Sequence, residues 1–181
     1  QYENERLNPY AIFTGNFPGN SETENPYHFA YSLIKEIQQN GRHEIASHSF
    51  SHFYCLEPNT SIEAFELDIV SAVSIAKKNF SVDLKSFVFP RNQFNSAFLS
   101  ILKKHGFKVV RSNPKHWSWS SHGEGIDALK RLFRISDTYL ALRRHGEYDT
   151  VNNFGLIETE GTRFLRPYSS KLKMLESLKV H

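Results

Sequence analysis

The sequence predicts an α/β fold in a single domain that spans residues 1–181. Strand-like and helix-like segments alternate from Pro9 to Arg111, which is the rhythm of parallel βα units in a barrel or an open sheet. A hydrophobic content of 39% over 181 residues is sufficient for one compact core. We find no internal repeat and no low-complexity linker, so nothing in the sequence divides the chain.

Each expected element has a local signal. Apolar and β-branched runs bounded by turn residues predict the strands, which are residues 9–14, 44–47, 85–89, 108–111, 156–159 and 164–166. Apolar residues at helical spacing predict helices at 26–40, 62–78, 96–105, 126–144 and 169–180. Asn25, Thr60 and Asn95 are the expected N-caps, with Glu63 completing a capping box after Thr60. We expect the apolar residues of the helix at 126–144 to face the core, namely Leu129, Leu132, Phe133, Ile135 and Leu140.

Composition and charge exclude several classes of function. The formal net charge is only +3 and the basic residues are scattered, so we expect no nucleic-acid partner. No apolar run approaches the length of a membrane span. Cys55 is the single cysteine, which rules out an intrachain disulfide and a cysteine-rich zinc knuckle. We expect this thiol to be buried and inert.

The first residues have no signal-peptide character. The chain has no initiator Met and could begin inside a longer protein, so its location stays open, with the cytoplasm favoured.

His48 and His52 are the most informative pair of polar residues. Two imidazoles four residues apart on a helical turn lie on one face and can share a metal ion. The pair follows a short expected strand, which is where α/β folds place their sites. Nine histidines in the chain make such spacings common by chance, so the spacing alone also permits two incidental surface histidines.

The surrounding segment, GRHEIASHSFSH at residues 41–52, resembles the second motif of the polysaccharide deacetylase family (NodB-like, carbohydrate esterase family 4). In that family both histidines of the motif bind a divalent metal. The resemblance therefore implies that His48 and His52 are metal ligands. Ser49 matches the position whose hydroxyl tightens the loop.

Two further segments are similar to the same family, in its capsule- and lipopolysaccharide-type subgroup. SFVFPRNQ at residues 86–93 resembles the third motif, although its order differs from the usual Arg-x-Pro. This implies that Arg91 orients a carboxylate base or clamps substrate, with a surface ion pair as the alternative. Asn92 could donate to a sugar or an oxyanion, or form a turn. Trp117, in KVVRSNPKHW, could stack on a sugar ring, as could Trp119, although core packing is equally compatible.

The family's first and last motifs have no match here. The first, a strand ending in adjacent Asp residues, should precede Pro9, and the last, which supplies a His, should follow His181. Asp68 and Asp83 stand in the wrong contexts. We therefore expect an incomplete or distorted (β/α) barrel of the polysaccharide deacetylase type, truncated at both ends. A homo-oligomer could cover its open edges.

The resemblance implies metal-dependent deacetylation of an N- or O-acetylated saccharide, with Zn²⁺ as the expected metal. In the family a carboxylate acts as general base and a His as general acid. This chain holds neither, so we expect the parent protein to be active and this chain alone to be inactive. The alternative is a non-catalytic saccharide-binding or scaffolding module of the same fold.

Overall fold

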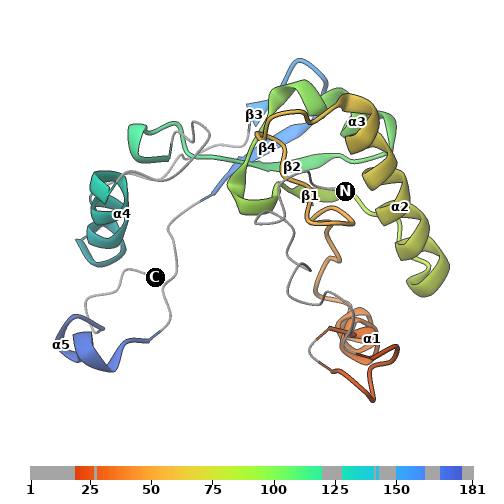
Figure 1. Cartoon of the computed structure of the whole chain (residues 1–181), viewed down its shortest axis with the longest axis horizontal. Helices are drawn as coiled ribbons and strands as arrows, with labels where there is room; N and C mark the ends of the chain where they lie inside the picture. Colours follow the sequence, from red (N-terminus) through yellow and green to blue (C-terminus); the bar gives the residue numbers. More distant parts are fainter. Residues whose placement is uncertain are drawn as a thin grey trace.

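The computed structural model describes residues 19–26, 28–119, 128–140, 142, 150–161 and 168–176. Helices α2 (Ile62–Phe80) and α3 (Leu99–Lys104) lie beside a central sheet, whereas α1 (Tyr31–Asn40), α4 (Ala128–Leu140) and α5 (Lys173–Glu176) lie away from it (Figure 1). Short 3-10 turns connect these elements at Pro90–Asn92, Ser96–Phe98, Trp117–Trp119 and Ser170–Leu172. The strands expected at 9–14 and 164–166 lie outside the described residues.

The sheet has four strands in the order β1-β2-β4-β3. Strands β1 (Ser86–Val88), β2 (Val109–Ser112) and β4 (Ile157–Glu160) are parallel neighbours, and Phe87 is in register with Val110. These three strands confirm the segments expected at 85–89, 108–111 and 156–159. Strand β3 (Thr150–Val151), which the sequence analysis missed, pairs antiparallel with β4. The mixed α/β architecture with a partial, open sheet agrees with the incomplete barrel that the sequence predicts.

The strand expected at 44–47 is reduced to one residue. Ser47 forms an isolated parallel bridge with Phe87 on the outer side of β1. This single bridge places the segment after Ser47 at the carboxyl end of β1.

Phenylalanines dominate the core between α2 and the sheet. Phe65 of α2 and Phe87 of β1 are fully buried, and their ring centroids are 5.9 Å apart in an edge-to-face arrangement. Phe107 also packs edge-to-face against Phe87, with ring centroids 5.7 Å apart. Such aromatic pairs bury large apolar areas and prefer this geometry. The core therefore fixes α2 against β1.

The first helix differs from its prediction. It begins at Tyr31 rather than after Asn25, because the Asn25 carbonyl accepts hydrogen bonds from His28 and Phe29 and closes a separate turn. Its apolar face is not buried, and Leu33 is 54% exposed. A helix this short is marginal by propensity alone, and contacts with the end of α2 support it. Tyr31 packs on the Phe80 ring at 5.2 Å, and the Gln38 side-chain NH₂ donates to the Phe80 carbonyl.

The caps of the next helices also shift. Ser61 is the N-cap of α2 and accepts from the amide of Ala64 at 3.1 Å, while the Thr60 hydroxyl donates to the Glu57 carbonyl. The capping box predicted at Thr60 is therefore wrong by one residue. Asn95 is a cap as predicted, since its side chain accepts from the amide of Ala97.

Helix α4 presents its leucines outward, which contradicts three of its five predicted core positions. Leu129, Leu132 and Leu140 are 60–67% exposed, Phe133 and Ile135 are half-buried, and Asp137 and Thr138 are buried. The helix contacts the 3-10 turn Trp117–Trp119, a partner too short to cover a long apolar stripe. In the described residues, no helix is long and apolar enough to cross a membrane.

The packing of α2 predicts that truncating Phe65 and truncating Leu67 change the free energy of unfolding by very different amounts. Phe65→Ala removes a fully buried ring and should lower the free energy of unfolding by about 3–5 kcal/mol. Leu67→Ala truncates a side chain that is 69% exposed and should change it by less than about 0.5 kcal/mol. Urea denaturation followed by circular dichroism measures both. Equal losses in the two variants would contradict this packing.

Candidate functional site

His48 lies at the carboxyl end of β1, held there by backbone pairing. The Ser47 amide donates to the Ser86 carbonyl, and the Val88 amide donates to the Ser47 carbonyl, both at 2.9 Å. The next residue, His48, then places its Nδ1 2.9 Å from the Val88 carbonyl oxygen. A carbonyl can only accept, so Nδ1 is the donor, and Nε2 is the ring nitrogen left for a metal. A histidine that donates one ring N–H to a backbone carbonyl has the arrangement usual for metal ligands.

His52 lies beside His48. The two ring centroids are 5.0 Å apart, with an interplanar angle of 64°. Two imidazoles on one tetrahedral zinc at ~2.0–2.1 Å would have centroids about 5 Å apart, so the pair fits a shared metal.

The expected helical turn between the two histidines is absent. Ser49 and His52 have left-handed backbone conformations, with φ of 65° and 58°, so the segment is a loop. The Ser49 hydroxyl accepts from the amide of Phe53 at 2.7 Å, which closes this loop. This contact agrees with the loop-tightening role that the family resemblance implies for Ser49.

Arg91 reaches the same end of the sheet through Tyr54, a residue that the sequence analysis missed. The Arg91 guanidinium lies 5.1 Å from the centre of the Tyr54 ring, and that ring is 5.2 Å from His52. Arg91 has a φ of 52°, a conformation that is costly outside glycine and that occurs at functional sites. The orienting role of Arg91 stays a prediction, while its stacking on Tyr54 is an observed contact.

Asn92 forms a turn that ties the third-motif segment to β2. Its side-chain oxygen accepts from Arg111 at 2.9 Å, and its backbone carbonyl accepts from Asn113 at 2.6 Å. The turn was one of the two expectations for this residue. A role in sugar binding would fall to its side-chain NH₂ group, because the oxygen is engaged.

Burial lowers the pKa of His52, and the charges of His48 and Arg91 lower it further. A lowered pKa keeps the imidazole neutral at pH 7, which is the form that binds metal. His52 is therefore held in its metal-binding form at neutral pH.

Cys55 lies close to this loop but is chemically inactive. The residue is 1% exposed, and burial, together with the nearby Asp68 carboxylate, raises its pKa to about 12. The thiol is thus protonated at neutral pH and is neither a nucleophile nor a metal ligand. This agrees with the structural role expected from the sequence.

His48 and His52 are two potential metal ligands. Among the residues that the structure describes, no group of three or more His, Cys, Asp or Glu side chains could hold a metal ion. A complete zinc site has four ligands, of which a catalytic site takes three from protein. A zinc ion at the histidine pair would therefore need further ligands.

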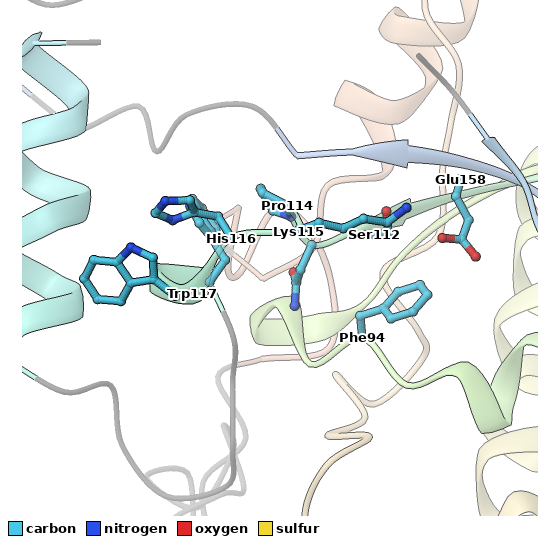
Figure 2. Close-up of a pocket in the computed structure, with 9 residues that line it drawn as sticks. Phe94, Ser112, Pro114, Lys115, His116, Trp117 and Glu158 are labelled. Atoms are coloured by element: carbon cyan, nitrogen blue, oxygen red, sulfur yellow. The ribbon is translucent and has the colours of Figure 1, made fainter. Parts of the chain in front are cut away.

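Trp117 lines a separate cavity of about 420 Å³. Figure 2 shows His116 and Trp117 on the side of the cavity near α4 and Glu158 at the opposite side. Trp117 is 47% exposed and contacts His116 and Phe133, at centroid distances of 5.5 and 5.1 Å. Trp119 also lines the cavity but is buried beneath the guanidinium of Arg134. Trp119 is therefore a packed side chain, as one of the two expectations had it, whereas Trp117 presents an exposed aromatic surface.

His48 borders a smaller cavity of about 210 Å³ between α1 and α2. Arg91 and Asn92 do not line this cavity.

Comparisons with known proteins identify the family. Residues 13–110, more than half of the chain, match the family described as Polysaccharide deacetylase. The chain therefore belongs to the polysaccharide deacetylase family. No curated protein matches it significantly. Among solved structures, IcaB from Ammonifex degensii is similar, with 19% identity and a TM-score of 0.42 over 46% of this chain. The aligned part spans 40% of the IcaB chain.

The lowered pKa of His52 predicts a low titration midpoint for this residue. In metal-free protein, His52 should titrate below 6.5 in an NMR titration of the imidazole protons. Because the unfolded chain binds the extra proton first, the stability due to His52 falls as pH drops from about 6.5 through the lowered value. A His52 midpoint at or above 6.5 would contradict the burial described here.

Proposed function

We propose that this chain is the metal-binding part of a deacetylase that hydrolyses an N- or O-acetyl group on a saccharide. The observation that carries the proposal is the histidine pair at the end of β1, in a chain of the polysaccharide deacetylase family. His48 and His52 would hold a divalent metal, with Zn²⁺ favoured because two neutral imidazoles suit its ligand preferences. A bound Zn²⁺ supplies an activated water and polarises a carbonyl oxygen.

The chain's own residues would position the metal and the substrate. His48 would bind through Nε2, since its Nδ1 is held by the Val88 carbonyl. Arg91, stacked on Tyr54, would present positive charge beside His52 and orient a carboxylate base or the substrate. A third ligand, a general base and a general acid would come from residues other than these.

A non-catalytic saccharide-binding module is the second candidate. The cavity at Trp117 supports it, because the cavity combines an exposed indole with polar and charged side chains from Asn113, Lys115 and Glu158. Aromatic surfaces edged by hydrogen-bonding groups suit sugar rings, which have apolar faces and hydroxyl rims. The two candidates share a saccharide ligand and differ in whether the metal site participates in a reaction.

Removal of either histidine should weaken zinc binding. His48→Ala and His52→Ala should each lower Zn²⁺ affinity by at least about tenfold, since each deletes one of two ligands. His43→Ala serves as the control because His43 is an exposed histidine of the same segment. Competition with a chromogenic chelator measures the affinity. If all three variants bind Zn²⁺ as the wild type does, the metal site lies elsewhere.

Saccharide binding at the Trp117 cavity can be tested by removing the indole. Trp117→Ala should reduce binding of an acetylated oligosaccharide, such as a chitin fragment, by about fivefold to a hundredfold, because stacking is worth roughly 1–3 kcal/mol. Tyr168→Ala is the control, since Tyr168 is 66% exposed and does not line the cavity. Isothermal titration calorimetry gives both values. An equal effect of the two substitutions would remove the cavity from the proposal.

A further inference from the structure

We propose that Asp68 of α2 is a positioning residue that holds the loop between His48 and His52 in its metal-binding shape. The inference rests on the proposed metal site, and it assigns a function to a carboxylate that does not itself bind the metal. Its sequence context excludes Asp68 as the family's missing Asp ligand. Its contacts in the structure point instead to a structural role in the loop.

The contacts of Asp68 fall on the two residues in the middle of the loop. Its Oδ2 accepts from the amide of Phe50 at 2.7 Å, and its Oδ1 accepts from the amide of Ser51 at 2.8 Å and from the Ser51 hydroxyl. An ionised carboxylate only accepts, so it can satisfy all three donors at once. One side chain thus binds the backbone midway between the two proposed ligands.

The loop needs such support because its backbone is strained. Ser49 and His52, which flank Phe50 and Ser51, both have left-handed φ values. Residues other than glycine keep this conformation only where surrounding contacts fix it. Without Asp68, the amides of Phe50 and Ser51 would lose their acceptors, and the loop could relax toward an unstrained backbone that separates the imidazoles.

Asp68 is itself held rigidly. It is 8% exposed and lies on the core face of α2, between the fully buried Phe65 and Ile69 and close to Ala72. The carboxylate therefore fixes the loop at a defined position relative to α2. Because both oxygens are engaged by loop donors, Asp68 acts through the loop and is a positioning residue rather than a ligand.

The test compares metal affinity in a graded set of full-chain variants. Asp68→Asn keeps one acceptor oxygen but turns an NH₂ group toward a backbone amide, and Ser51→Ala removes one of the three donors. Outer-shell substitutions typically cost 10–100-fold in metal affinity. We expect Asp68→Asn to bind Zn²⁺ about 10–100-fold more weakly and Ser51→Ala less than tenfold more weakly. Asp83→Asn, a matched charge change at an exposed residue paired with Lys77, should bind normally.

Two readouts separate positioning from general folding. Circular dichroism and thermal melting select a temperature at which every variant is fully folded, and Zn²⁺ affinity is measured there by chelator competition. In metal-free protein, a nuclear Overhauser contact between the His48 and His52 rings should be present in the wild type and in Asp83→Asn, and lost in Asp68→Asn.

The outcomes distinguish the two proposals. A folded Asp68→Asn variant that keeps the ring contact and binds Zn²⁺ as the wild type does overturns the positioning role. If the wild type binds no Zn²⁺, the proposed function fails. The ring contact still decides whether Asp68 shapes the loop.

Discussion

The pairing of Ser47 with β1 is the constraint on which the rest of the site depends. Two backbone hydrogen bonds at 2.9 Å fix Ser47 beside Phe87, and this determines where the histidine loop begins. Phe87 is in turn held by the aromatic core beneath it. Because β1 also leads into Pro90 and Arg91, the two segments that resemble family motifs emerge at the same end of the strand.

The loop after Ser47 combines backbone strain with strong local support. Its left-handed residues would be unstable alone. Backbone amides of the loop donate to the Ser49 hydroxyl and the Asp68 carboxylate, and these bonds, together with the Tyr54 ring beside His52, hold the loop in place. The same partial burial that fixes His52 also lowers its pKa and keeps the ring neutral. Packing thus favours the neutral form of His52, which is the form that binds metal.

Sequence alone predicted much of this arrangement, and its errors have physical causes. The strands at β1, β2 and β4 were predictable because apolar runs end at clear turn residues. The prediction of a helical turn between the histidines was wrong. The left-handed backbone at Ser49 could not be predicted, because the sequence has no glycine at that position. The outward leucines of α4 show that helical spacing predicts an apolar face but not its partner. The role of Asp68 had a sequence signal, because a carboxylate stands on the core-facing side of α2. The contact of Tyr54 with His52 had no such signal.

The proposed function depends on the joint binding of one metal ion by His48 and His52. X-ray absorption at the zinc edge, on the full chain loaded with one equivalent of Zn²⁺, tests it most directly. We expect two imidazole ligands at about 2.0–2.1 Å, with the remaining positions filled by oxygen. His48→Ala or His52→Ala should each reduce the imidazole count by one. A first shell without imidazole, or one unchanged by both substitutions, would show that the two histidines do not share the metal.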